Sequence, residues 1–453
     1  MRGYIFSRRF LVLALTCSAL LATLAGVLYV RSGISQAAYT AANHSVSAHP
    51  HYSYAGLPDG QHFQCQSPTA LVHCYGPAQI RNAYSIQPVL DSGINGQGST
   101  IVILDAFQAP HIEEDLKRFD RTFGLSNPKL NILTPDGLTP FDPTDPRQVN
   151  WSAEISLDVE WAHVVAPAAT IDLVLAKSDQ DADLGRVLHY AVTKNLGDVI
   201  SMSFGENEAC LDPAVGKQWH QDFLRATRAG MTLFSSSGDT GDAQSTCDNS
   251  ANVKAVSQPA VDSLVTAVGG TQLVADTATG SYTHETTWNE PAFQLATGGG
   301  FSTMIGKPAF QYHMPGIGAY RAVSDVAYDA AIDGGVLAVW SDGPRGPRSF
   351  YIFGGTSAGS PQWAGIVALA VQLDHHRLGF LNPLLYAIGH SPKYGQAFND
   401  ITSGNNTITL SNSDGSSVTI PGYDAKVGWD PVTGWGSPRV SKLLPMLLAT
   451  QKK

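Results

Sequence analysis

Residues Phe353–Leu369, FGGTSAGSPQWAGIVAL, join a glycine-rich turn to an apolar run that predicts a buried helix. Pro361 fits near the start of this helix, because the N–H groups of a first helical turn have no intrahelical partner. Those free N–H groups and the helix dipole favour negative charge, so they would stabilise both a nucleophilic Ser357 and a developing oxyanion. Alternatively, Ser357 is only the N-cap of a core helix.

The composition is that of a globular, acidic protein. The chain has 453 residues, of which 43% are hydrophobic and 15% are charged, and its formal net charge is −10. This length supplies an ample core for one large domain or two smaller ones. The negative charge argues against nucleic acid as a partner, because nucleic-acid binding requires basic surface.

The N-terminus has the features of a targeting element. Arginines precede an uncharged stretch over residues 10–30, which is long enough to cross a bilayer and longer than an ordinary signal-peptide core. The small residues Ser35 and Ala37 offer a cleavage site. Residues 1–37 are therefore either a signal peptide or a membrane anchor, and we expect the chain to be extracellular or anchored on the outer face of the cell membrane.

Four cysteines lie outside this stretch, and an even number in an exported chain favours disulfides. Pairing by proximity predicts Cys65–Cys74 and Cys210–Cys247. Residues 38–76 show no periodicity and are interpreted as a linker or loosely packed lead-in, ahead of a domain over residues 77–449.

From Tyr75 onward, apolar runs alternate with helical patterns. Such alternation predicts βαβ units, hence an α/β fold with a doubly wound, mainly parallel sheet and helices on both faces. Ligands of such sheets bind beyond the carboxyl ends of the strands. The expected strands cover residues 100–105, 170–175, 199–203 and 232–235, and the expected helices cover 111–123, 152–165, 181–194 and 219–228.

Two acidic residues, Glu154 and Asp158, lie one turn apart on the expected helix 152–165. Leu157 and Trp161 fall beside them, so this face is expected to turn inward, where the two carboxyl groups would share protons. The alternative is a solvated acidic stripe, and Glu160 is expected to be exposed. His163 points to about the opposite face and is interpreted as a satisfied or surface histidine.

A further acid, Asp239, follows the strand 232–235 and Gly238. This position lies at the rim of the sheet, where a neutral carboxyl group could donate a hydrogen bond to an oxyanion. The alternative is an aspartate in an ordinary turn.

These features occur together in one family. The chain resembles the sedolisin (serine-carboxyl) peptidases, which have a subtilisin-like fold, from about Tyr75 to Leu447. The matching segments, in family order, are GQGSTIVILD (96–105), EISLD (154–158), SMSFG (201–205), SGD (237–239), TAVGGT (266–271), GTS (355–357), GFLNPLLY (379–386), NDI (399–401) and GWD (428–430).

The resemblance implies a serine-type endopeptidase that cleaves polypeptides at acid pH. It makes Ser357 the nucleophile, Glu154 the general base, Asp158 its partner and Asp239 the oxyanion donor. It also implies that Ser203, Phe204 and Gly205 line the substrate cleft, where an extended peptide could pair with exposed backbone.

The resemblance further implies one Ca²⁺ ion. Asp400 and Asp430 would supply carboxylates, and Ile401, Lys426 and Gly428 would supply backbone carbonyls, which are the hard oxygen ligands that Ca²⁺ prefers. Lys426 stands where the family usually has a small residue, and its ammonium group could lower the affinity. Without the resemblance, Asp400 and Asp430 would be interpreted as turn aspartates.

Two departures from the family pattern leave alternatives open. Only about 45 residues separate the apolar stretch from the peptidase-like region, whereas the family carries a long folded propiece. Phe204 and Asp105 replace residues that extend the acidic relay in some members. The alternatives are a histidine-dependent, subtilisin-like hydrolase using Asp105 and Ser357, and an inactive, surface-displayed pseudopeptidase. The expected partners are polypeptide substrates and a membrane, with no nucleic acid, and the chain is expected to be monomeric.

Overall fold

The structure is a computed structural model that describes residues 45–451, apart from residues 47, 49, 61 and 413. The expected targeting element over residues 1–37 lies outside this part of the chain. No helix within the described ranges is long and apolar enough to cross a membrane.

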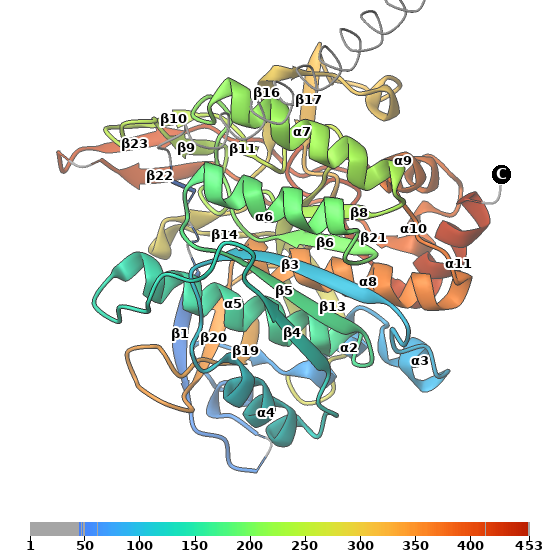
Figure 1. Ribbon diagram of the computed structural model, residues 1–453. Coiled ribbons are helices and arrows are strands. Elements are labelled where there is room, and N and C mark those ends of the chain that lie inside the picture. The colour runs from blue at the N-terminus through green and yellow to red at the C-terminus, as the bar shows by residue number, and fades with distance from the viewer. Residues whose placement is uncertain (1–44, 47, 49, 61, 413, 452–453) are drawn as a thin grey trace, which may run out of the picture.

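An eight-stranded sheet forms the centre of the molecule (Figure 1). Its strands run in the order β13-β12-β8-β6-β3-β5-β4, and β18 pairs with β12. Every pairing is parallel except that of β13 with β12, which confirms the predicted α/β fold. The strands are β3 (Thr100–Ala106), β4 (Lys129–Leu133), β5 (Thr170–Ala176), β6 (Val199–Met202), β8 (Thr232–Ser236), β12 (Thr266–Ala275), β13 (Tyr282–Thr287) and β18 (Val326–Asp329).

Four helices cover the two faces of this sheet: α5 (Pro146–Val165) and α8 (Gly359–Asp374) on one, and α6 (Asp181–Lys194) and α7 (Pro213–Arg228) on the other (Figure 1). Strand β3 shows why the sheet needs a layer of helices on each face. Ile101 and Ile103 belong to the core beneath α5 and α8, whereas Val102 and Leu104 belong to the core beneath α6 and α7. Because successive residues face opposite ways, a strand covered on both faces is a continuous apolar run.

Helices α5 and α7 begin six residues earlier than predicted. Each starts with a proline that follows a capping aspartate: the side chain of Asp145 accepts from the N–H of Arg147, and that of Asp212 accepts from the N–H of Ala214. This start signal is polar and precedes the apolar periodicity, so the hydrophobic pattern alone places the helix start too late.

A second, four-stranded sheet contains part of the chain that was expected to be a lead-in. Its order is β1 (His51–Gly56), β20 (Phe350–Gly354), β19 (Gly335–Val339) and β2 (Cys74–Tyr75). Strand β1 runs antiparallel to β20 (Figure 1). The ring of Tyr52 packs on those of Trp340, Tyr351 and Phe353. The expectation of a loose segment over residues 38–76 was therefore wrong for β1 and β2. Aromatic residues far along the chain anchor β1, and β2 pairs with β19.

Both predicted disulfides are confirmed, Cys65–Cys74 and Cys210–Cys247. The remaining helices are α2 (Pro77–Ala83), α3 (Gln87–Asp91), α4 (Ile112–Phe123), α9 (Asn382–Gly389), α10 (Tyr394–Ala397), α11 (Val440–Gln451) and the 3₁₀ turns η1 (Gln64–Gln66), η2 (Pro291–Phe293), η3 (Ala309–Gln311) and η4 (Thr356–Ala358). The remaining strands are β7 (Glu206–Asn207), β9 (Ala243–Ser245), β10 (Asn252–Lys254), β11 (Ser257–Gln258), β14 (Asn289–Glu290), β15 (Leu295–Ala296), β16 (Gly300–Gly306), β17 (Tyr320–Val323), β21 (Phe398–Asn399), β22 (Ile408–Ser411), β23 (Ser417–Ile420) and β24 (Ser437–Pro438).

Candidate active site

Ser357 lies in η4, between the end of β20 and the start of α8. The turn into η4 depends on Gly355, which has a φ of 105°, a conformation that side chains rarely adopt. A Cβ atom at this position would also come within 2.7 Å of the Asp239 carboxyl group. Gly355 therefore allows the backbone to pass close to Asp239 and brings that carboxyl group beside the serine turn.

Ser357 opens onto a cavity of about 380 Å³. The cavity lies at the carboxyl ends of β6 and β8, the edge where the sequence predicted the site. It brings together Ser357, Asp239 and the three predicted cleft residues. Its lining comprises His51, Ser203, Phe204, Gly205, Ser236, Gly238, Asp239, Thr240, Gln244, Ser245, Ser257, Phe293, Gln294, Leu295, Thr356, Ser357 and Leu410.

Glu154 and Asp158 lie beneath this cavity on α5, and both are fully buried. Burial raises the pKa of each well above its ordinary value. The Ser357 hydroxyl group acts in the other direction on the pKa of Glu154, so the serine and this carboxyl group face each other. Neither oxygen of Glu154 makes a hydrogen bond of standard geometry with a described residue. The two groups are therefore neighbours, without a hydrogen bond of standard geometry between them.

Asp158 is held by Ser203, one of the three predicted cleft residues. The Ser203 hydroxyl group donates to Oδ1 of Asp158 at 2.8 Å. The charge of Glu154 adds to the effect of burial on the pKa of Asp158. The two acids therefore turn inward together, and the alternative of a solvated acidic stripe was wrong.

A third carboxyl group, Asp105, joins this pair from the carboxyl end of β3. It is fully buried, and burial raises its pKa to about 8. Its charge raises the pKa of both Glu154 and Asp158. The sequence left the extension of the acidic relay in doubt, whereas the structure places Asp105 within electrostatic reach of both helix acids.

The other polar residues of α5 differ in part from expectation. Glu160 is fully buried, and its carboxyl group accepts from the backbone N–H of Val339 at 2.9 Å. The expectation that Glu160 is exposed was therefore wrong, because α4 and β19 also pack against this helix. His163 is fully buried, so the interpretation as a surface histidine was wrong. Its Nε2 lies 3.1 Å from Oδ1 of Asp120, whereas its Nδ1 makes no hydrogen bond with a described residue.

Asp239 lines the cavity together with Ser357, and its carboxyl group has several partners. Oδ1 accepts from the backbone N–H of Thr356 at 2.8 Å and from the hydroxyl group of Thr356 at 2.7 Å. Oδ2 lies 3.3 Å from Nε2 of His51. Burial acts to raise the pKa of Asp239, but His51 and Thr356 outweigh it and lower the pKa below its ordinary value. Its partners thus favour the carboxylate, whereas the sequence interpretation required the neutral acid.

His51 is the residue of this site that the sequence analysis missed. Its backbone pairs with Gly354, three residues before Ser357, and its side chain lines the cavity. The segment HYSYAG does alternate polar and aromatic residues, which is a weak strand signal. Nothing in that alternation identifies β20 as the partner strand or Asp239 as the contact.

The predicted calcium ligands also come together. Asp400 accepts from the N–H of Gly428 at 3.1 Å, and Asp430 accepts from the N–H of Lys426 at 3.1 Å. Burial raises the pKa of Asp430 to about 6. Neither carboxyl group has an ion pair with a described lysine or arginine, and the Lys426 side chain is exposed. Two carboxylates without a protein cation suit a hard divalent ion. Within the described ranges, no group of three or more His, Cys, Asp or Glu side chains is placed to hold a metal.

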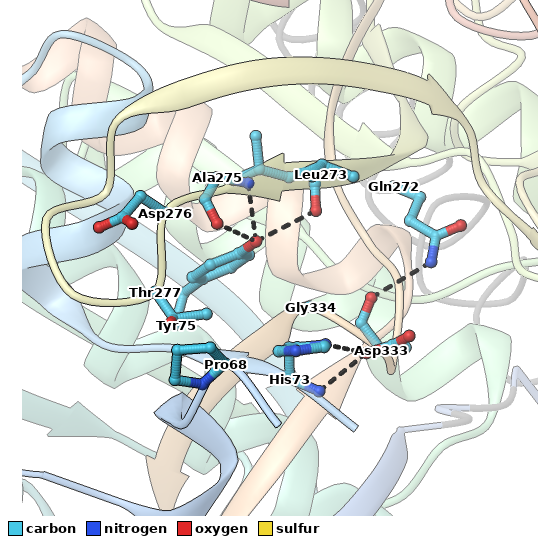
Figure 2. Close-up of a pocket in the computed structure, with 11 residues that line it drawn as sticks. Pro68, His73, Tyr75, Gln272, Leu273, Ala275, Asp276, Thr277, Asp333 and Gly334 are labelled. Carbon is cyan, nitrogen blue, oxygen red and sulfur yellow. Dashed lines mark hydrogen bonds and ion pairs between the residues drawn. The ribbon is translucent and has the colours of Figure 1, made fainter. Parts of the chain in front are cut away.

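Figure 2 shows a second cavity, of about 280 Å³, between the end of β12 and the turn at Asp333. Its polar groups are occupied with one another. The Tyr75 hydroxyl group bonds to the backbone of Leu273 and Ala275, and Nδ1 of His73 lies 3.1 Å from Asp333. None of the predicted site residues lines this cavity, so the cavity at Ser357 is the candidate active site.

Comparisons with known proteins agree with this fold and site. The model of the subtilase family matches residues 159–383. The chain is 32% identical to kumamolisin of Bacillus sp. (strain MN-32) over 418 residues, which are 88% of this chain and 68% of kumamolisin. It is 31% identical to sedolisin of Pseudomonas sp. (strain 101), covering 81% of this chain and 61% of sedolisin. Human tripeptidyl-peptidase 1 is 29% identical over 65% of this chain and 52% of that protein.

A solved structure shows the same architecture. Pseudomonas sedolisin, described as a serine-carboxyl proteinase in complex with pseudo-iodotyrostatin, superposes with a TM-score of 0.71 and 28% identity, covering 84% of this chain and 99% of that one. The fold and the relatives together define a serine-type peptidase of subtilisin-like architecture. More narrowly, the chain belongs to the sedolisin family of serine-carboxyl peptidases, which confirms the resemblance seen in the sequence.

Proposed function

We propose that this chain is an endopeptidase that hydrolyses peptide bonds at acid pH, with Ser357 as nucleophile, Glu154 as general base and Asp239 as oxyanion donor. The observation that supports this most is the position of the buried Glu154 carboxyl group, which faces the Ser357 hydroxyl at the start of a helix. A general base must lie within reach of the proton that it removes. This position is where a histidine-dependent hydrolase would need its imidazole, so the contact with Glu154 favours the carboxyl mechanism.

In the first step, Oγ of Ser357 attacks the scissile carbonyl carbon while its proton moves to the ionised Glu154. The carbonyl oxygen becomes an oxyanion, which accepts a hydrogen bond from the neutral Asp239. When the tetrahedral intermediate collapses, Glu154 returns the proton to the amine that leaves, and an acyl-enzyme remains. A water molecule then repeats the sequence, with Glu154 again as base, and releases the second product.

Asp158 and Asp105 support the proton transfer in this scheme. Glu154 can act as a base only when it has given up its own proton, and burial opposes that ionisation. A cluster of three buried carboxyl groups can hold one negative charge and place it on Glu154 when the serine attacks. The Ser203 hydrogen bond to Asp158 stabilises the charged form of the cluster.

The substrate would lie across the cavity beside Ser203, Phe204 and Gly205. Gly205 packs so closely that an added Cβ atom would lie 2.1 Å from the Ser257 hydroxyl group. A glycine there keeps the backbone accessible at the cavity wall, which suits pairing with an extended polypeptide.

Calcium is the proposed cofactor, with one ion held by the carboxylates of Asp400 and Asp430 and the carbonyls of Ile401, Lys426 and Gly428. When bound, the ion would neutralise the two carboxylates and cross-link their loops. The proposal rests on the convergence of both carboxyl groups on residues 426–428.

Export is proposed for the same chain, either secreted or held at the outer face of the membrane through residues 10–30. The two disulfides support an oxidising compartment. The peptidase domain is proposed to span residues 77–449, with β1 and β2 added to it as strands of its second sheet.

The test is cleavage of an unstructured polypeptide by the purified protein from about pH 3 to pH 8. We expect an acid-side optimum with a fall on each flank, because the scheme needs one acid ionised and another neutral. Ser357→Ala should lower the rate by about 10⁴-fold or more, since the nucleophile is lost. Ser360→Ala is the matched control, because Ser360 lies three residues further on, in the first turn of α8, and bonds to Ser201 at 2.8 Å instead of lining the cavity.

Unchanged cleavage in Ser357→Ala would contradict the mechanism. A folded wild-type protein without cleavage at any pH would instead support the pseudopeptidase alternative, in which the intact cavity only binds polypeptides. An optimum above neutral would favour the histidine-dependent alternative, because an imidazole base loses activity as it protonates.

A further inference from the structure

His51 is the one histidine among the described residues that lines the cavity of Ser357. It comes from the segment ahead of the peptidase-like region, and strand pairing places it there. Its backbone registers with Gly354, and the next residue, Tyr52, is packed among three aromatic rings. Strand pairing and aromatic packing therefore hold the imidazole of His51 in place at the cavity wall.

The contact of His51 is with the oxygen of Asp239 that the reaction needs. Oδ1 is already occupied by the N–H and the hydroxyl group of Thr356. Oδ2 is the remaining oxygen, and Nε2 of His51 lies 3.3 Å from it. To serve an oxyanion, Asp239 must carry a proton and direct it into the cavity. An imidazole nitrogen at Oδ2 occupies the position from which the proton would be donated, and His51 acts to lower the pKa of Asp239, which favours the carboxylate.

We propose that His51 is a positioning residue that holds Asp239 as a carboxylate and thereby restricts peptide cleavage to acid pH. This inference rests on the proposed function, because it assigns the oxyanion role to Asp239. Besides His51 on β1, the charged group that acts on Asp239 from a packed element is Glu154 on α5, and the charges of Asp239 and Glu154 oppose each other. The other contact, Thr356 in η4, is neutral.

The two flanks of the pH profile separate the roles of the acids. The productive enzyme has Glu154 ionised and Asp239 protonated. At low pH its population depends only on how readily the base loses its proton, and at high pH it depends only on how tightly Asp239 keeps its proton. A change in the pKa of Asp239 therefore moves the neutral flank and leaves the acid flank in place.

The decisive experiment measures kcat/KM across pH, which reports on the free enzyme, for wild type and His51→Gln. On the neutral flank, we expect kcat/KM to rise about tenfold for each pKa unit that Asp239 gains. The acid flank should stay unchanged, so the optimum should move towards neutral pH. His51→Lys, which places a cation beside Asp239, should also favour the carboxylate, so its neutral flank should not rise above that of wild type.

Control variants distinguish this effect from a structural one. His220→Gln removes a histidine that is paired with Asp262 at 2.8 Å outside the cavity, and it should leave the profile unchanged. In an Asp239→Asn background, His51→Gln should have no further effect on the neutral flank, because no acid remains there for His51 to control. Thermal melting of each variant checks that the fold is retained.

A neutral flank that stays in place in folded His51→Gln would overturn the inference. So would an equal rise in the Asp239→Asn background, or an active wild-type protein whose intact mass shows that residue 51 has been removed. These outcomes leave the proposed function standing. Failure of the function would appear separately, as cleavage that survives Ser357→Ala or as an Asp239→Asn profile identical to that of wild type.

Discussion

The carboxyl groups on α5 and the carboxyl group of Asp239, all near Ser357, have pKa values that are shifted in opposite directions. Beneath the serine lie three fully buried acids, Glu154, Asp158 and Asp105, and the pKa of each is raised. The hydrogen bond to this group is the one that Ser203 donates to Asp158. At the cavity wall, Asp239 is half-buried, and Thr356 and His51 supply hydrogen-bonding or charged partners, so its pKa is lowered.

This difference shows that burial alone does not decide whether an acid is charged. Desolvation acts to raise the pKa on both sides, and the donors beside each carboxyl group determine the outcome. The pKa values of the two sides are the reverse of what the proposed reaction needs, because the base, Glu154, tends to be neutral and the oxyanion donor, Asp239, tends to be charged. Acid pH can correct the state of Asp239, and the carboxyl cluster can share a charge with Glu154. The following predictions test the two sides separately.

Glu154→Gln should have the largest effect. The amide keeps the shape of the side chain but cannot take the serine proton, so we expect the cleavage rate to fall by about 10³-fold at the optimum. Single-turnover cleavage measured at several pH values checks this. Glu160→Gln, on the same buried helix but away from Ser357, is the control. A Glu154→Gln enzyme within a few-fold of wild type would remove the base from the proposed scheme.

Asp239→Asn should have a smaller effect of a different kind. An amide can donate to an oxyanion at any pH but binds it less strongly than an acid, so we expect a loss of about 10²-fold at the optimum. The decline of activity towards neutral pH should flatten, because no proton is lost there. The pH dependence of kcat/KM tests this, and a wild-type decline in the variant would show that Asp239 is not the acid.

The buried cluster should make folding stability depend on pH. The pKa of Asp105 is raised to about 8 when folded, against about 3.9 for an unperturbed aspartate, so the folded state keeps a proton that the unfolded state releases. This contribution is complete at pH below about 4 and is lost as the pH rises to about 8. Urea unfolding at pH 4, 6 and 8 should show a decreasing free energy of unfolding, and Asp105→Asn should reduce the decrease.

An exposed acid provides the control for that measurement. The pKa of Asp248 is lowered to about 2 by Thr246 and Ser250, so its contribution is present at pH above about 4 and is lost only as the pH falls towards 2. Asp248→Asn should therefore leave the slope between pH 4 and pH 8 unchanged. An Asp105→Asn protein with the full wild-type slope would contradict the assignment to Asp105.

Removal of calcium should have the smallest effect on the active site, because neither Asp400 nor Asp430 lines the cavity of Ser357. A ligand that binds only the folded state stabilises it by mass action, by about 3 kcal/mol at a hundredfold excess over Kd. A chelator should therefore lower the melting temperature of metal-replete protein by several degrees, and added Ca²⁺ should restore it. No shift in folded, metal-replete protein, or an equal shift in Asp400→Asn, would contradict the site.

Much of this molecule could be predicted from the sequence, because the responsible forces act over short distances along the chain. Apolar runs and helical periodicity predicted β3, β5 and α6, and proximity predicted both disulfides. Glu154 and Asp158 share a helix face through their spacing alone. The motifs around Ser357 and Asp239 identified both residues as site candidates.

The tertiary structure decided the charge states and the residues that burial or pairing brings in from elsewhere. Glu160 is buried because α4 and β19 cover a helix face that its own sequence marks as polar. His51 reaches Asp239 because β1 pairs with β20, and aromatic side chains far along the chain from β1 pack on Tyr52 of this strand. A pKa depends on the hydrogen-bond donors and charges that surround a group in space. The sequence could therefore identify Asp239 as a candidate site residue but could not determine its protonation state.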